Sequence, residues 1–131
     1  MLDAHASAIL DLLRADPHLT VYDGGTVPDL TEPPYVVVYL SIDAESMSRL
    51  CMSSDRTQVR LTTHSVGANG QAARIVASRV RAALLDVKLA VDGWTSYPIR
   101  RDYGQPPDRD ESTGRVAMDA IDVWTYTTSQ A

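Results

Sequence analysis

The segment that most constrains this fold is an unbroken apolar run, Tyr35-Val36-Val37-Val38-Tyr39-Leu40. Aromatic and β-branched residues favour an extended backbone, so the run predicts a strand. Successive side chains of a strand point to opposite faces of its sheet, and here both faces are apolar. The run is therefore expected to be a central strand, or a strand that a partner chain covers.

Length and composition predict one globular domain over residues 1–131. The chain has 131 residues, of which 44% are hydrophobic and 22% charged, and these values are ordinary for a chain with its own core. No apolar run approaches the ~20 residues of a membrane-spanning helix. The first residues show no secretory signal, and Cys51 is the single cysteine. We therefore expect a protein of a reducing cytoplasm that binds no membrane.

Apolar periodicity predicts the remaining elements. Helical spacing indicates helices over Leu2–Arg14 and Gln71–Asp86, the second with Asn69 as its N-cap. Alternation indicates a half-exposed strand over Thr57–His64, and a long strand is expected over Arg115–Thr128. Without a regular β-α-β order, this favours an α+β fold, with two helices packed on one face of a largely antiparallel or mixed sheet. Shorter extended segments are expected at Leu19–Tyr22 and Lys88–Ile99.

Two polar segments are predicted to be irregular connections. Residues Ser41–Arg56 are rich in Ser, Asp and Glu, and Arg100–Gly114 is charged and contains Gly104 and two prolines. A charged loop of that length is uncommon in a small domain and tends to be functional or disordered. The second segment also carries an acidic cluster, which consists of Asp108, Asp110 and Glu111.

Residue patterns for catalysis or metal binding are weak. His5, His18 and His64 are far apart in the chain, and no cysteine or histidine pair has the spacing of metal ligands. The acidic cluster could hold a hard cation, but its neighbours favour a solvated charged loop. Cys51 and His64 would act as nucleophile and base only if a pocket gathered them. We therefore expect no cofactor and no catalytic site.

The charge balance favours contacts with proteins over contacts with nucleic acid. The chain has 12 basic and 17 acidic residues and a formal net charge of −5, which is unfavourable for gripping phosphates. Lys88 is the single lysine, and arginine is preferred for ion pairs at protein interfaces. The candidate interface residues, most of them in the two polar segments, are Arg49, Arg56, Arg60, Arg100, Arg101, Arg109 and Arg115.

The order of elements resembles a known family over about Leu2–Thr127. An amphipathic helix and a proline-bearing loop precede the strand that begins Pro34-Tyr35-Val36-Val37, and the strand Thr57-Gln58-Val59-Arg60-Leu61 follows. An alanine-rich helix over Ala72–Leu85 then precedes a final long strand. This order is similar to that of the tail-terminator or tail-completion proteins of long-tailed (siphovirus-type) bacteriophages.

That resemblance implies structural work and a fold like that of the tail-tube subunit. Such proteins form a ring, typically a hexamer, which caps the head-proximal end of the tail tube, stops its polymerisation and docks on the head connector. The implied partners are copies of the chain, the tail tube protein and the connector protein, with DNA in transit through the lumen of a virion assembled in the host cytoplasm. The acidic cluster is the candidate lumen lining. The alternatives are a head-side connector or stopper, and a small ligand-binding or hydrolytic domain.

Overall fold

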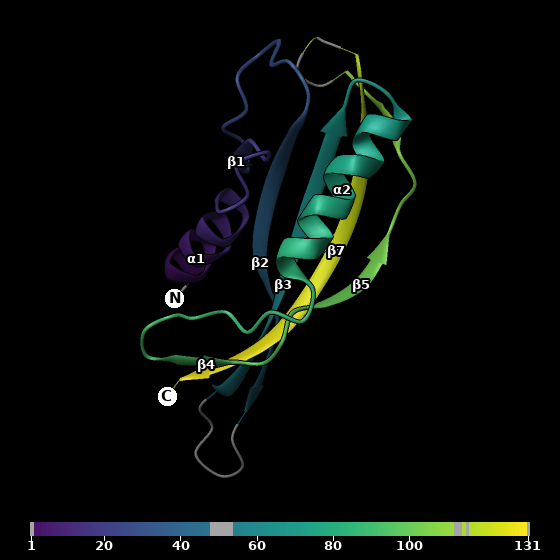
Figure 1. Ribbon diagram of the computed structural model, residues 1–131. Coiled ribbons are helices and arrows are strands. Elements are labelled where there is room, and N and C mark those ends of the chain that lie inside the picture. Colours follow the sequence, from purple (N-terminus) through teal and green to yellow (C-terminus); the bar gives the residue numbers. More distant parts are fainter. Residues whose placement is uncertain (1, 48–53, 112–113, 115, 131) are drawn as a thin grey trace.

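The computed structural model describes residues 2–47, 54–111, 114 and 116–130, which form two helices and seven strands (Figure 1). The protein is an α+β fold with a mixed sheet, as the sequence predicts. In chain order the elements are α1 (Leu2–Arg14), β1 (Val21–Asp23), β2 (Tyr35–Met47), β3 (Ser54–Gly67), α2 (Gly70–Leu84), β4 (Trp94–Ser96), β5 (Arg100–Gly104), β6 (Asp108–Asp110) and β7 (Ala117–Gln130).

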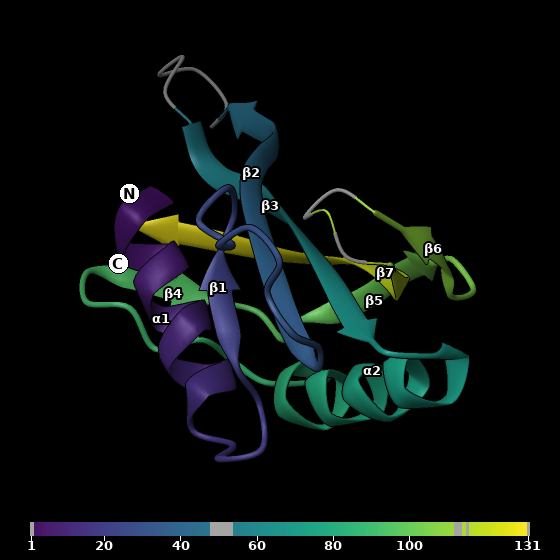
Figure 2. The ribbon, with the colours of Figure 1, turned by 90° about the horizontal axis from the view of Figure 1, so that it is seen from above.

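The sheet is organised around β7. Its main order is β1-β2-β3-β7-β4, and β5 and β6 also pair with β7. Strand β1 runs parallel to β2, and the other pairings in the described chain are antiparallel. One edge of β7 therefore pairs with β3, while the other edge pairs with three short strands, as Figures 1 and 2 show.

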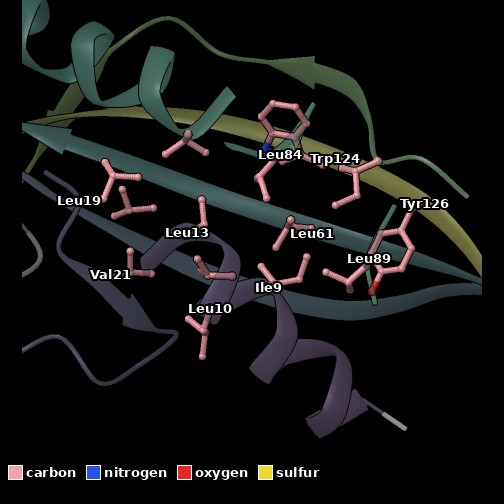
Figure 3. Close-up of a cluster of buried hydrophobic side chains, with 14 of the residues drawn as sticks. Ile9, Leu10, Leu13, Leu19, Val21, Leu61, Leu84, Leu89, Trp124 and Tyr126 are labelled. Carbon is pink, nitrogen blue, oxygen red and sulfur yellow. The ribbon is translucent and has the colours of Figure 1, made fainter. Parts of the chain in front are cut away.

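The main core lies on one face of the three long strands. The register places Leu40 opposite Leu61 and Leu61 opposite Trp124, so these three side chains share a face. Both helices add buried side chains to this cluster, including Ile9 from α1 and Leu84 from α2 (Figure 3). Side chains from elements far apart in the sequence therefore form one core.

Among the side chains of β2 whose burial is described, residues 35–42, burial on both faces is confined to the first part. Tyr35 and Val37 belong to a second, smaller apolar cluster on the face away from the main core. Strand β1 covers the edge of β2 over Val36–Val38. Further along, the Tyr39 side chain is 48% exposed. The burial on both faces that we predicted for the apolar run therefore holds for Tyr35–Val38.

A buried histidine fastens α1 to the sheet. The Nδ1 atom of His5 lies 2.8 Å from the hydroxyl oxygen of Tyr126, and the His5 ring stacks on Tyr126 and meets Trp94 edge-on. The Nε2 atom has no hydrogen-bond partner among the described residues. Burial disfavours charge, so it lowers the pKa of His5 and raises the pKa of Tyr126. Both rings are therefore uncharged at neutral pH.

The start of α2 lies directly against the end of β3. A Cβ atom at Gly67 would lie 2.6 Å from the carbonyl carbon of Ala72, so the connection requires glycine. Asn69 is the N-cap, as predicted, because its side chain accepts a hydrogen bond of 2.8 Å from the Ala72 amide. These two residues allow the chain to turn from strand to helix without a loop.

Two segments that we predicted to be irregular contain strands. Strands β2 and β3 both extend into Ser41–Arg56, and Arg100–Gly114 contains β5 and β6. Asp108 and Asp110 consequently lie in a strand and not in a loop. Both predictions were wrong for the same reason. Backbone pairing with a neighbouring strand forms these elements, and their polar sequences show no apolar alternation to detect.

The other predicted elements are confirmed with small shifts of their ends. Helix α1 has the predicted bounds, and the predicted strand Thr57–His64 lies within β3. Helix α2 ends at Leu84 instead of Asp86, because Leu85 has an extended ψ of 128° and Asp86 a left-handed φ of 64°, and a helix can continue through neither. The final strand is Ala117–Gln130, two residues later than predicted.

We predict that Gly67→Ala lowers the free energy of unfolding by about 1–3 kcal/mol, the usual cost of overpacking. The added methyl group meets backbone atoms of α2, which cannot move without displacing the helix. Urea denaturation followed by circular dichroism measures the loss. The matched control is Gly70→Ala, where a Cβ would meet the flexible end of Arg74 at 3.3 Å. Equal midpoints for the two variants would contradict the close packing.

Acidification should destabilise the fold through His5. Its pKa is lowered in the folded protein from the ordinary 6.5, so protons bind the unfolded chain first. The stability that neutral His5 permits is present above pH ~6.5 and is lost as the pH falls toward the folded-state pKa. His64 acts in the opposite sense, because its raised pKa gives stability below pH ~6.5 that is lost as the pH rises through the folded-state pKa.

We predict that His5→Phe flattens the fall in unfolding free energy between neutral pH and about pH 5, because phenylalanine binds no proton. Urea titrations at a series of pH values measure the slope. The exposed Ser7 on the same helix supplies the control, and Ser7→Ala should keep the parental slope because neither side chain binds a proton in this pH range. A parental slope in His5→Phe would show that its burial does not govern the response to acid.

Candidate interaction surfaces

The described candidate arginines form separate local ion pairs and not one patch. Most of the paired side chains are partly or largely exposed, and such pairs contribute little to stability. Arginines placed this way keep their charge at the surface, where a partner can reach it. The pairs are Arg60 with Asp102 (3.6 Å), Arg100 with Asp86, Arg101 with Asp122 (2.9 Å) and Arg109 with Glu111 (2.6 Å).

Some of the predicted candidates cannot be placed. Arg49, Arg115 and Cys51 lie outside the described residues. Arg56 is exposed in β3. The remaining candidates therefore come from β3, β5 and the region of β6.

The Arg101–Asp122 pair is the most buried of these. Asp122 is 9% exposed on β7, and Arg101 Nε on β5 donates to its Oδ1 atom at 2.9 Å. A Cβ at Gly104 would overlap the Arg101 guanidinium, so this glycine makes room for the pair. The carboxylate on β7 thereby holds a guanidinium beside the groove between β5 and α2.

This arginine groove has a volume of about 340 Å³. Arg74, Ser78 and Arg81 of α2 line one side, and Arg101 and Gln105 line the other. Within the described chain, Arg74 and Arg81 have no ion-pair partner, so their charges are not neutralised locally. The groove is a positively charged surface that the sequence analysis did not single out.

A second hollow, the acidic pocket, lies on the opposite face of the sheet and has a volume of about 300 Å³. Its charged lining consists of Asp29, Asp110, Asp119 and His64, with Tyr39 beside them. It lies on the other face because its residues on β2, β3 and β7 alternate with those of the main core.

Within this pocket, His64 and Asp119 form a close pair. The Nδ1 atom of His64 lies 2.8 Å from Asp119 Oδ2, and this hydrogen bond raises the pKa of His64. The Tyr39 ring meets the His64 ring edge-on, with centroids 5.4 Å apart. The other carboxylate oxygen, Asp119 Oδ1, is buried without a hydrogen-bond partner in the described chain.

The chemistry of this pocket suits recognition of a cation. A histidine oriented by a carboxylate can act as a base, but the described lining contains no serine, threonine or cysteine as a nucleophile. Among the described residues, no group of three or more His, Cys, Asp and Glu could hold a metal ion. Carboxylates beside an aromatic ring favour a guanidinium or ammonium group.

In the part of the chain that the structure describes, no helix is long and apolar enough to span a membrane.

Sequence reasoning named Arg101, Asp110 and His64 but missed the other charged residues that build the two hollows. Asp119 and Asp122 interrupt the apolar final strand, and this interruption was the available signal. The partners of these aspartates follow from strand register, which pairs β5 and β3 with β7. Arg74 and Arg81 carry no signal beyond their place on the polar side of a helix.

Comparison with known proteins decides the class of this protein. Residues 7–126 match the family described as tail completion protein gp17. The chain belongs to this family. The tail completion family consists of structural proteins of the bacteriophage tail, so the resemblance inferred from the order of elements is confirmed. A comparison with curated proteins finds no match.

Two solved structures share the fold of this tail completion family member. One is from the virion of the native gene transfer agent particle, with a TM-score of 0.66, 19% identity, and coverage of 95% of this chain and 93% of that chain. The other is the gp17 protein of bacteriophage SPP1, with a TM-score of 0.55, 20% identity, and coverage of 95% and 88%. At these identities the likeness shows a common fold.

We predict that Arg101→Met costs about 1–3 kcal/mol of unfolding free energy, because it leaves the buried Asp122 carboxylate without its partner. The matched control is Arg100→Met, since Arg100 and Asp86 are 64% and 58% exposed. An exposed pair contributes at most about 1 kcal/mol. Urea denaturation of both variants at neutral pH measures the difference. Equal losses would show that Asp122 does not depend on Arg101.

Proposed function

We propose that this chain forms a ring that caps the head-proximal end of the phage tail tube. The ring stops tube polymerisation and joins the tail to the head connector, and DNA passes through its lumen. The observation that carries this proposal is the match of residues 7–126 to the tail completion family. In this proposal both helices pack on one face of the sheet, as in a tail-tube subunit.

Open sheet edges support contacts between copies. Strand β1 covers β2 only at Val36–Val38, so from Tyr39 onward the outer edge of β2 pairs with no described strand. Across the sheet, the outer edges of β5 and β6 are also unpaired in the described chain. Open edges readily add a strand from another chain. Two different edges on one chain favour a head-to-tail contact, which closes into a ring when the rotation between neighbouring copies divides a full turn.

The hairpin of β2 and β3 extends one of these edges. Strand β3 pairs with β7 from Thr57 onward, whereas its pairing with β2 continues outward to Ser54. This end of the hairpin has no third strand among the described residues. It is therefore the proposed arm by which one copy reaches its neighbour or the tail tube.

Size and charge suit a conduit for DNA. A compact chain of this length is about 36 Å across, and six such subunits in a closed ring leave a hole of roughly that width. A subunit with a net charge of −5 does not grip phosphates, so DNA can slide past. Of the candidate lumen residues, Asp108 and Glu111 are exposed and remain in this proposal, whereas Asp110 lines the acidic pocket.

The proposal is tested with purified tails that lack this protein. We expect the added protein to bind one end of each tail, to block further growth when tube protein is supplied, and to make the tails competent to join heads. Electron microscopy measures end labelling and tube length. Tails that already carry the protein are the control and should bind no more of it. Binding to isolated heads and not to tails would favour a head-side connector and overturn the proposal.

A further inference from the structure

The two hollows on opposite faces of the sheet carry opposite charges. The lining of the arginine groove includes three arginines and one aspartate. The lining of the acidic pocket includes three aspartates and one histidine. One surface therefore has a surplus of positive charge, and the other has a surplus of negative charge.

The positive surplus comes from two arginines on one side of α2. Arg74 and Arg81 are seven positions apart, which places them about two helical turns from one another, on the same side. Both are exposed, and neither has an ion-pair partner in the described chain. Arg79 on the same helix shows the contrast, because it is bound to Asp16 at 3.1 Å. The groove therefore presents two guanidinium groups that are available to anions from outside the chain.

The acidic pocket presents the groups that a guanidinium binds. Asp29 is exposed at its rim, and Asp119 Oδ1 lies buried within it without a hydrogen-bond partner in the described chain. Tyr39 adds an exposed aromatic ring. Arginine binds carboxylates through paired N–H donors and stacks on aromatic rings, so these groups together match its chemistry.

We propose that the arginine groove of one copy docks on the acidic pocket of the next copy. The two surfaces differ and lie on opposite faces, so the contact is head-to-tail. It occupies one surface of each copy and leaves the other surface of each copy open to a further copy. Nucleic acid is a poorer occupant of the groove, because the chain as a whole carries a charge of −5. The inference rests on the proposed self-assembly and names the side chains that direct it.

Charge reversal tests the contact. The variant Arg74→Glu with Arg81→Glu makes both surfaces acidic, and the variant Asp29→Arg with Asp110→Arg makes both basic. Each double variant on its own should associate at least about tenfold more weakly than the parent, since like charges then face each other. An equimolar mixture should recover association, because each groove again meets a pocket of opposite charge. The readouts are the mass in solution by light scattering and the fraction of tail ends occupied in electron micrographs.

Controls separate this contact from folding and from the proposed function. Lys88→Glu makes the same change of charge as Arg81→Glu at an exposed site outside the groove, and it should associate like the parent. Circular dichroism and urea midpoints confirm that each variant is folded. Unchanged association of the reversed variants, or a mixture that does not recover association, would overturn the inference but would not contradict the proposed function. A parent protein that neither associates nor binds tails would overturn both.

Discussion

The rest of this structure depends on the pairing of β7 along both of its edges. Trp124 lies opposite Leu61 in the β3–β7 register, is fully buried, and donates from Nε1 to Thr63 Oγ1 at 3.0 Å. The same strand carries Tyr126, which binds His5 of α1, and Asp122, which binds Arg101 of β5. One strand therefore joins the core, the first helix and the polar edge of the sheet, and both hollows contain side chains from it.

The elements that the sequence predicts are those whose burial leaves an apolar pattern, on both faces at Tyr35–Val38 and on one face elsewhere. Helix α1 and the alternating part of β3 each place apolar residues at the period of their own structure, so the pattern records the contact with the core. Strands β5 and β6 leave no such pattern, because β5 is exposed along most of its length and forms through backbone pairing with β7. The outer part of the β2–β3 hairpin was missed because it too is a polar sequence that forms a strand through backbone pairing. The family resemblance was nevertheless correct, because it depended on the order of elements.

The candidate surfaces were less predictable than the fold. Arginine was chosen for its chemistry, and the choice did include Arg101, which borders the groove. The pairings that shape both hollows join Arg101 to Asp122 and His64 to Asp119, and they depend on strand register across long stretches of chain. Strand register follows from packing of the whole sheet, and it cannot be read directly from a single sequence. Arg74 and Arg81 are recognised as candidates only in the structure, where β5 and Pro107 form the other side of the groove.

The central place of β7 also sets an order of events when the chain is made. Strands β4, β5 and β6 all precede β7 in the sequence, and their described strand partner is β7. They emerge from the ribosome before that partner, whereas β2 and β3 can already form a hairpin with a bare edge. Closing the sheet then joins segments about 60 residues apart, and such long-range pairing is slow. In an infected cell crowded with identical nascent chains, that bare edge is where neighbouring chains would join before either sheet is complete.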